Sequence, residues 1–295
     1  MRPSPRRARA CARVVALLAA LGGAARAAPL GAQCRPPASS HEARLLAFYA
    51  APVAFSPATA PERMPAGAVR VGAEGAPVPV PDAALRQTSL CYQSSTQSTR
   101  LAPLFGRPRV TLGLPAGLTL EGSYLPPITV GGATPALLSL AVARTQPLPG
   151  SGGRALVALR VHGTAGTVRG AITCARDQLQ MADPAAPCYG TRPSRDTFRP
   201  DMVGGEAVAA VRAWRDRVAL YGGGGVTWER PRFQVGFTDA AGTTDATRVS
   251  VELRRGTLLG GVTARASRTL DLELQAYVVP ADVTTWRLGA GYRLR

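Results

Sequence analysis

The sequence has 295 residues, of which 46% are hydrophobic, and it carries 35 Lys+Arg against 18 Asp+Glu, a formal net charge of +17. Every basic residue is Arg; with the six in the first 26 positions set aside, 29 remain against 18 acidic residues, a net +11. This charge is spread singly along alternating segments, whereas a nucleic-acid binder gathers it on one face, so no nucleic-acid partner is expected. After the first 32 residues no apolar run approaches the roughly 20 residues of a spanning helix, so a membrane role would have to use strands.

The first 32 residues have the order of a secretory signal peptide. Arginines crowd the first 13 positions, an apolar stretch follows at residues 14–21, and small residues occupy most of positions 24–32. A charged region, a short apolar region and a cleavage zone in that order direct a chain to secretion. We therefore expect residues 1–32 to be a signal peptide that is removed near Ala32.

Residues 33–108 form a segment rich in Pro, Ala and Ser. Within it we expect one short helix at residues 41–49 and one strand at residues 69–76. Prolines alternate with valines at residues 77–81, and because each proline removes a ladder donor, this stretch cannot be a central strand. The segment is expected to plug a barrel, to pack under it or to contribute its early strands.

Four cysteines lie beyond the signal peptide: Cys34, Cys91, Cys174 and Cys188. An even number in an exported chain favours disulfides, with three connectivities to choose from. Cys174 and Cys188 bracket a polar loop of about 15 residues, a closure worth on the order of 3 kcal/mol in the chain-entropy model. We predict this bridge, and the Cys34–Cys91 bridge then follows by elimination.

From residue 109 to residue 295 the pattern changes to repeated blocks of about 8 to 12 residues separated by turn signals, which is typical of an all-β sandwich or barrel. In residues 270–279 leucines alternate with Asp271, Glu273 and Gln275, and successive side chains of a strand take opposite faces. The expected strands, about twelve in all, are 109–114, 118–125, 135–145, 154–163, 166–173, 206–214, 217–228, 232–238, 247–254, 257–266, 270–279 and 286–295. Residues 69–76 and 50–55 would raise the number to fourteen.

Strand length and the nature of the polar face favour a membrane barrel over a soluble one. The later blocks reach the roughly 9–11 residues of a transmembrane strand, and aromatic residues such as Trp214 and Trp286 stand toward block ends. One face of each block is apolar and the other carries charge, which suits a hydrated lumen. The predicted fold is an all-β antiparallel transmembrane barrel of about 12–14 strands with a plug-like or irregular N-terminal segment.

The charged face of these blocks supplies the candidate lumen residues. They are Arg154, Arg160, His162, Arg248, Glu252, Arg254, Asp271, Glu273 and Arg287. The arginines among them would form an anion-attracting ladder, or each would pair with a nearby carboxylate. The excess of basic residues favours the ladder.

Three resemblances support a bacterial outer-membrane barrel of uncharacterised type. Gly289, Tyr292 and Leu294 resemble the assembly signal near the C-terminus of such barrels, although the sequence ends in Arg295 instead of an aromatic residue. Residues 114–118 and 123–127 resemble a segment of uncharacterised exported barrels, which implies no activity. A segment preceding a barrel is also similar to the plan of long-chain fatty-acid transporters, and the analogy extends to small porins at the level of architecture alone.

Catalytic, cofactor and metal sites are not expected. His162 could act as the base of a lipid hydrolase or acyltransferase with a serine such as Ser139 or Ser250, but no spacing ties them together. No CxxC occurs, and His41 and His162 are isolated, which disfavours zinc.

The glycines at residues 222–225 lack the GK[ST] ending of a phosphate loop. In a strand they indicate a kink or a close approach, and we expect the N-terminal segment to be what approaches them.

The leading interpretation of function is a passive channel or small-solute transporter in the bacterial outer membrane. The alternatives are a closed structural or binding barrel acting through its extracellular loop, an outer-membrane lipid-modifying enzyme, and a soluble periplasmic sandwich. Outer-membrane lipid and the outer-membrane assembly machinery are the expected partners, and the solute is not identified.

Counting strands back from the C-terminus places the connections on two sides of the membrane. The turn at residues 280–282 and the long stretch 174–203 are predicted to be extracellular. The same count places residues 126–134 and 239–246 in the periplasm.

Overall fold

The structure is a computed structural model that describes residues 33–82, 85, 91, 103–214, 216–280 and 282–294. All of these belong to one unit, residues 32–295. The predicted signal peptide, residues 1–32, lies outside the described residues. No helix within the described ranges is long and apolar enough to cross a membrane.

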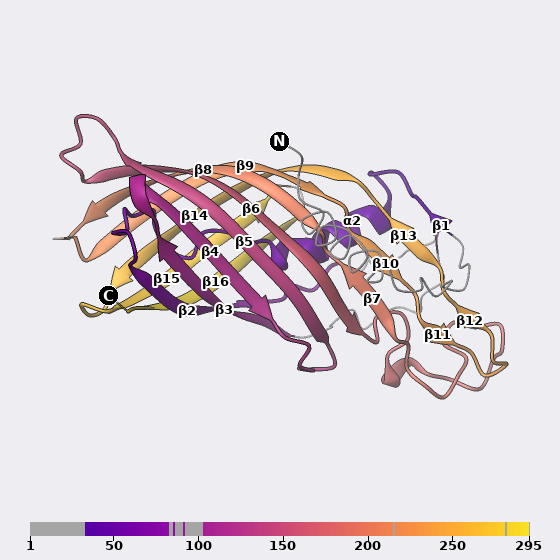
Figure 1. Cartoon of the computed structure of the whole chain (residues 1–295). Coiled ribbons are helices and arrows are strands. Elements are labelled where there is room, and N and C mark those ends of the chain that lie inside the picture. The colour runs from indigo at the N-terminus through magenta and orange to yellow at the C-terminus, as the bar shows by residue number, and fades with distance from the viewer. Residues whose placement is uncertain are drawn as a thin grey trace, which may run out of the picture. The chain divides into compact units, whose positions relative to one another are not determined.

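Ten of the strands in the described part of the chain close into an antiparallel barrel, which confirms the predicted all-β barrel class and corrects the expected 12–14 strands (Figure 1). They follow one another in sequence order around the wall, and β16 closes the ring on β2 while β6 pairs directly with β8. The ten are β2 (Val69–Pro77), β3 (Leu104–Gly113), β4 (Leu118–Leu125), β5 (Thr134–Pro147), β6 (Ala155–Gly170), β8 (Met202–Ala213), β9 (Val218–Glu229), β14 (Leu253–Arg265), β15 (Leu270–Val279) and β16 (Val283–Arg293).

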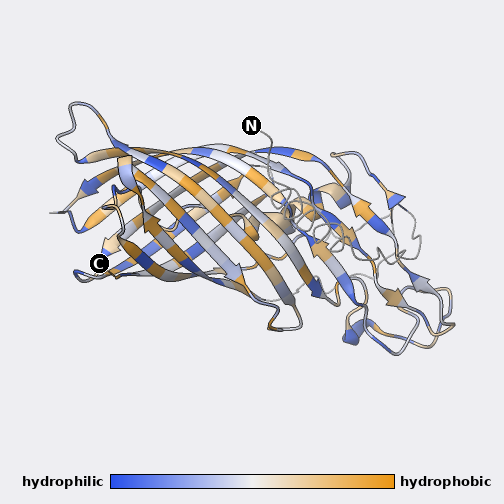
Figure 2. Cartoon of the chain, viewed as in Figure 1, coloured by the Kyte–Doolittle hydropathy of each residue, from blue (hydrophilic) through white to orange (hydrophobic). Residues whose placement is uncertain are grey.

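Side chains of the wall alternate between an apolar outer surface and a buried interior, as strand geometry requires. On β5, Leu138, Leu140 and Val142 are each about half exposed, at 50%, 50% and 48%, while Ser139 and Ala141 between them are each 3% exposed. Hydrophobic and hydrophilic residues alternate along the neighbouring strands as well (Figure 2). A contiguous apolar belt around a closed barrel is the surface that lipid covers, because the closed ladder leaves no backbone edge unpaired.

The two ends of the barrel differ in the length of their connections. One end, which we call the turn rim, carries the short turns 114–117, 148–154, 214–217 and 266–269. The other end, the loop rim, carries the connections 126–133, 171–201, 230–252 and 280–282, and β2 ends and β3 begins there. Outer-membrane barrels have short periplasmic turns and longer extracellular loops, so the loop rim is the extracellular end.

Residues 280–282 and 174–203 both lie at the loop rim, on the extracellular side, as predicted. The predicted periplasmic position of residues 126–134 and 239–246 is wrong. Residues 126–134 and 239–246 also lie at the loop rim instead of the opposite end. For residues 126–134 the difference arises because residues 154–163 and 166–173 form the single strand β6 and not two strands. For residues 239–246 it arises because the expected strands 232–238 and 247–254 are not wall strands and lie within the one connection between β9 and β14.

Exposed aromatic side chains form a girdle at each rim. Trp214 (74% exposed) and Tyr292 (48%) lie toward the turn rim. Tyr124 (56%), Trp228 (51%) and Trp286 (54%) lie toward the loop rim. Amphipathic rings take these places at the two interfaces of a bilayer. The girdles therefore mark the edges of the lipid-covered band.

Beyond the loop rim the sheet continues as an extension outside the ring. There β6 leaves β8 and pairs in turn with β7 (Asp196–Arg199), which continues through β10 (Arg232–Gln234) and β13 (Arg248–Ser250) to β1 (Gln33–Cys34). β11 (Phe237–Thr238) and β12 (Thr244–Asp245) form a separate small hairpin. The whole sheet thus has 14 strands among the described residues, and the expected strands 232–238 and 247–254 belong largely to this extension rather than to the barrel wall.

Gly166 explains why β6 is read as two strands from sequence. Its φ is +136°, and a Cβ at this position would lie 2.1 Å from the carbonyl oxygen of Ala136 on the neighbouring strand. Only glycine accommodates so close an approach of two backbones. The glycine is therefore a bend within one strand, near the point where β6 changes partner, instead of a turn between two strands.

Residues 41–60 of the N-terminal segment lie inside the barrel (Figure 1). Its helix α2 (His41–Ala50) begins at Ser40, whose hydroxyl accepts the Ala43 N–H at 3.1 Å, and a 3-10 helix follows at Ala51–Val53. The 3-10 helix η3 (Arg176–Gln178) belongs to the connection between β6 and β7, and η2 (Pro115–Gly117) to a turn. The segment is plug-like as predicted, although the wall starts at Val69, ahead of the expected boundary at residue 109.

Both disulfides that the sequence predicts are present. Cys174 and Cys188 are joined within the long connection of the loop rim, and Cys34 is joined to Cys91.

The glycines of β9 mark a close approach of two wall strands, not of the N-terminal segment. A Cβ on Gly223 would lie 2.1 Å from the Ala207 carbonyl oxygen of β8, while a Cβ on Gly222 would meet nothing nearer than 3.5 Å. We expect Gly223→Ala to lower the free energy of unfolding by about 1–3 kcal/mol, because backbone must shift to admit the methyl group. Gly222→Ala is the matched control, and urea titration of both variants in lipid vesicles measures the difference. Equal midpoints for the two would contradict the close approach.

Candidate functional site

Interior arginines hold the N-terminal segment by its backbone carbonyl groups. From β3, Arg107 donates to the carbonyl oxygens of Val53 and Ala54 at 3.1 and 2.7 Å. From β16, Arg287 donates to those of Ala51 and Ala54 at 3.1 and 2.8 Å. Hydrogen bonds from charged donors are the stronger kind, so these contacts fix the segment against the wall.

Arg160 of β6 joins the plug to two wall carboxylates. It is 3% exposed and donates to the Phe55 carbonyl oxygen at 2.5 Å and to the Ser56 carbonyl oxygen at 3.3 Å. It also pairs with Glu206 of β8 at 2.6 Å and with Glu121 of β4 at 3.2 Å. One guanidinium thus ties together the segment and two strands of the wall.

The side chain of Phe55 fills the centre of this cluster. It is fully buried, and the guanidinium carbons of Arg107, Arg109 and Arg160 lie 4.8, 4.2 and 5.2 Å from its ring centroid. A cation over an aromatic face within about 6 Å is attracted to it. Ser56, the next residue, donates to Gln275 of β15 at 2.5 Å.

Several interior arginines pair with carboxylates, which is one of the two alternatives that the sequence left open. Glu74 of β2 lies 2.5 Å from Arg107 and 3.1 Å from Arg109. Asp271 lies 2.8 Å from Arg293 and 3.3 Å from Arg70. The cavities found between these side chains measure about 20 and 40 Å³, which leaves room for a few water molecules each.

Five of the predicted lumen residues are in the interior. Arg160, His162, Asp271 and Arg287 are buried at 2 to 4% exposure, and Glu273 is partly buried and accepts a hydrogen bond from Tyr221.

The other four predicted lumen residues lie elsewhere. Arg154 is exposed in the 148–154 turn, and Arg254 points outward, with its guanidinium 5.7 Å from the ring of Trp228. Arg248 lies on β13 of the extension, and Glu252 is exposed. The assignment is wrong for these residues.

For Arg248, Glu252 and Arg254 the reason for the error is the block 247–254. Its alternation is genuine, but Val249 and Val251 are 1% and 4% exposed and pack in the interior core, so the apolar face points inward and the charged face outward. Alternation fixes which residues share a face and does not fix which face meets the lumen.

Several interior charges are absent from the predicted set of lumen residues. Glu74, Arg107, Glu121 and Glu206 each alternate with the outward residues of their strands, so strand periodicity could have found them. Arg107 was missed because it precedes residue 109, where the expected barrel began.

No hydrogen bond joins His162 to Ser139 or Ser250 in the part of the chain that the structure describes. Ser139 shares a 2.9 Å hydrogen bond with Thr164, and Ser250 lies on β13 in the extension. The His162 ring instead packs against Gly204, where an added Cβ would lie 2.7 Å from Nε2. Its contacts are those of a packed interior residue.

A second feature of the described structure is an apolar cavity of about 420 Å³ toward the loop rim. The N-terminal segment forms one side of it with Tyr49, Pro52 and Val53. The wall and its connections contribute the remaining described lining residues, which are Val78, Leu104, Phe105, Gly106, Leu125, Pro126, Ile128, Val130, Ala133, Pro135, Val168 and Phe198. Small-molecule sites in proteins have this volume and this apolar character.

Comparison with known proteins gives structural neighbours only. No protein-family model matches the sequence, and no curated protein matches it. Ail, the attachment invasion locus protein of Yersinia pestis, is 13% identical over 78% of this chain and 99% of its own, with a TM-score of 0.30. The translocator domain of the autotransporter NalP from Neisseria meningitidis is 8% identical over 79% and 91%, with a TM-score of 0.35, and Omp33 of Acinetobacter baumannii is 9% identical over 77% and 98%, with a TM-score of 0.26.

At these TM-scores the assignment rests on the geometry of the barrel itself. The closed antiparallel ring, the outward apolar belt and the aromatic girdles define an outer-membrane β-barrel. Within that class this protein is, over its described residues, a ten-stranded barrel whose lumen is occupied by its own N-terminal segment.

Proposed function

We propose that this protein is a closed binding barrel that takes up a small apolar molecule, of the kind of a single acyl chain, in the cavity toward its loop rim. The observation that carries the proposal is an apolar cavity of about 420 Å³ that adjoins a barrel interior in which Arg107, Arg160 and Arg287 hold the N-terminal segment. Neither catalysis nor passive conduction is part of this proposal.

The chemistry of the lining supports an apolar ligand. No charged side chain is among the described residues that line the cavity, so a charged solute would lose its hydration without compensation. Ile128 and Val130 line the cavity and are also 62% and 63% exposed at the rim. They connect the cavity to the apolar surface of the barrel, and this gives a hydrocarbon a route that avoids water.

The filled lumen weighs against the passive channel that the sequence suggested. Arg107, Arg160 and Arg287 each bind carbonyl oxygens of the N-terminal segment across the interior. Conduction would require the segment to leave, which would expose these paired groups together. We expect the purified protein to give no steady conductance in planar bilayers, and a stable open channel would overturn the closed barrel.

A photoactivatable fatty acid tests the ligand site. With the protein in lipid nanodiscs, irradiation should label peptides that contain Phe105 and Leu125. Ala133→Phe fills the cavity and should reduce labelling of those peptides about ten-fold. Ala165→Phe, an outward-facing substitution on β6, is the matched control and should leave it unchanged. Equal labelling of the cavity peptides in both variants would refute the site.

A further inference from the structure

The extension beyond the loop rim has one apolar and one arginine-rich face. Its apolar face packs inward through Val168, Phe198, Phe233 and Val249, which are 9%, 4%, 3% and 1% exposed. The opposite face carries five arginines, which we call the arginine face: Arg35, Arg169, Arg199, Arg232 and Arg248. A two-faced sheet of this kind presents its polar side outward.

Cross-strand register arranges these side chains in rows. Arg169 stands opposite Thr197, which stands opposite Gln234, and the row continues through Arg248 to Gln33. Five adjacent strands therefore contribute polar donors to one continuous line. Neighbouring strands lie about 4.8 Å apart, so the row extends over roughly 19 Å.

The next row places two like charges directly against each other. Arg199 stands opposite Arg232, and Arg232 stands opposite Ser250. Like charges directly opposite on neighbouring strands are destabilising. Only Arg232 of the five has a carboxylate partner within the described ranges, through its ion pair with Asp201.

The arginine face therefore holds positive charge that the described structure does not neutralise. Arg35, Arg169, Arg199 and Arg248 form no ion pair within the residues that the structure describes. The Nε atom of Arg248 is buried and finds no hydrogen-bond acceptor in that part of the chain. A cleft of about 600 Å³ runs along these residues and is large enough to admit an anionic group.

The position of the face relative to the membrane indicates which anion it meets. On β6 the outward residues Leu159 and Val161 are 66% and 62% exposed in the apolar belt, and Arg169 lies further along the same outward row. At about 3.3 Å per residue and a strand tilt near 40°, Arg169 lies roughly 20 Å beyond Val161 along the barrel axis. Tyr124 of the loop-rim girdle is in register with Ala165 through Leu138, so Arg169 lies four residues beyond the girdle that marks the edge of the lipid-covered band.

We propose that the arginine face binds the clustered phosphate groups of an anionic lipid headgroup in the outer leaflet. Guanidinium groups hold phosphate in bidentate geometry, and several arginines on adjacent strands match several phosphates on one headgroup. A bound polyanion would also relieve the opposition of Arg199 and Arg232. The site lies outside the lumen and apart from the apolar cavity.

Lipid retention by the full-length protein tests this proposal. The triple variant Arg169→Gln/Arg199→Gln/Arg248→Gln removes three charges from the arginine face. The matched control Arg144→Gln/Arg154→Gln/Arg268→Gln removes three charges from exposed side chains toward the turn rim. Each protein is purified in neutral detergent. It is titrated with a phosphate-bearing lipopolysaccharide, with the enzymatically dephosphorylated form of that lipid and with inorganic diphosphate. Native mass spectrometry counts the ligand that each protein binds.

We expect the arginine-face variant to bind the phosphorylated lipid at least about ten-fold more weakly than the wild type and the control variant. The dephosphorylated lipid should bind the wild type as weakly as the phosphorylated lipid binds the variant. Equal binding by the two triple variants would overturn the proposal. Inorganic diphosphate that binds as tightly as the phosphorylated lipid would also overturn it, because the ligand would then be a soluble anion.

Discussion

Arg160→Met is expected to lower the free energy of unfolding of the barrel by about 3–5 kcal/mol, one of the two largest effects that we predict. The variant leaves Glu121 and Glu206 without their shared cation, and each is less than a tenth exposed. It also removes the donor to the carbonyl oxygens of Phe55 and Ser56. Removing one partner of a buried ion pair costs more than the pair contributes, because a charge remains buried and uncompensated.

Urea unfolding in lipid vesicles, followed by tryptophan fluorescence, measures this change. Arg154→Met is the matched control, since Arg154 is exposed in a turn and its loss should change stability by less than about 0.5 kcal/mol. Adding Glu206→Gln and Glu121→Gln to Arg160→Met should recover part of the loss, because the uncompensated charges disappear. A variant within about 1 kcal/mol of wild type would show that Arg160 does not join the plug to the wall.

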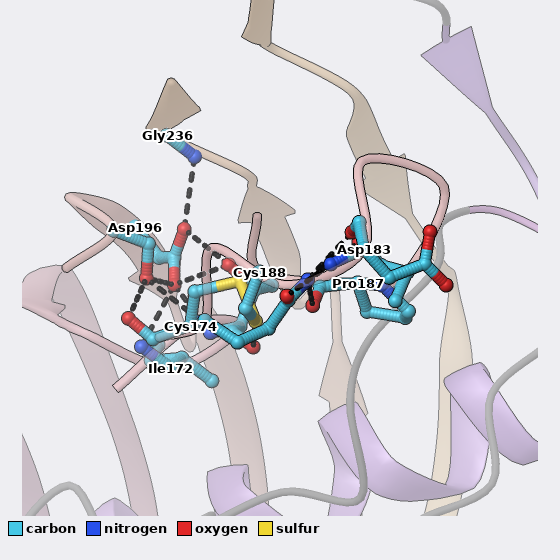
Figure 3. The surroundings of a disulfide bond; sticks show 11 residues. Ile172, Cys174, Asp183, Pro187, Cys188, Asp196 and Gly236 are labelled. Atoms are coloured by element: carbon cyan, nitrogen blue, oxygen red, sulfur yellow. Dashed lines mark hydrogen bonds between the residues drawn. A yellow bond between two sulfur atoms is a disulfide. The ribbon is translucent and has the colours of Figure 1, made fainter. Parts of the chain in front are cut away.

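Asp196→Ala is expected to unfold the connection between β6 and β8 locally. Asp196 is fully buried and accepts the N–H groups of Ile172, Thr173 and Gly236 at 2.7, 2.6 and 2.8 Å, and the Ser194 hydroxyl at 2.7 Å (Figure 3). Each buried donor left unsatisfied costs about 1–3 kcal/mol. Three backbone N–H groups would lose their partner at once, although the neighbouring Cys174–Cys188 bridge remains.

Limited proteolysis of the folded protein reports this local unfolding. Cleavage within residues 171–201 should become at least about ten-fold faster in Asp196→Ala, while the barrel core stays resistant. Asp183→Ala is the control, because Asp183 lies in the same connection, is exposed and caps only the Ala185 N–H. Cleavage rates that are equal in the two variants would contradict the role of Asp196.

The features that the sequence could predict are those that depend on neighbouring residues. The alternation in residues 270–279 and 286–295 gave two strands of the wall at nearly their observed bounds, because the two-residue period of a strand is a local property. The pairing of Cys174 with Cys188 was also predictable, since a separation of 14 residues favours closure. The apolar belt followed from the same periodicity.

Tertiary structure alone decided which strands close the ring and what fills it. Residues 247–254 alternate as regularly as β15, yet their valines turn into the core because the extension packs over the N-terminal segment. Arg160 and Phe55 are 105 positions apart, and their hydrogen bond depends on a carbonyl group, which carries no sequence signal. The sequence by itself determined the fold class, the outward apolar face and both disulfides. The number of strands in the ring, the filled lumen and the arginine face were decided by tertiary structure, because each depends on pairings between distant residues that local patterns do not encode.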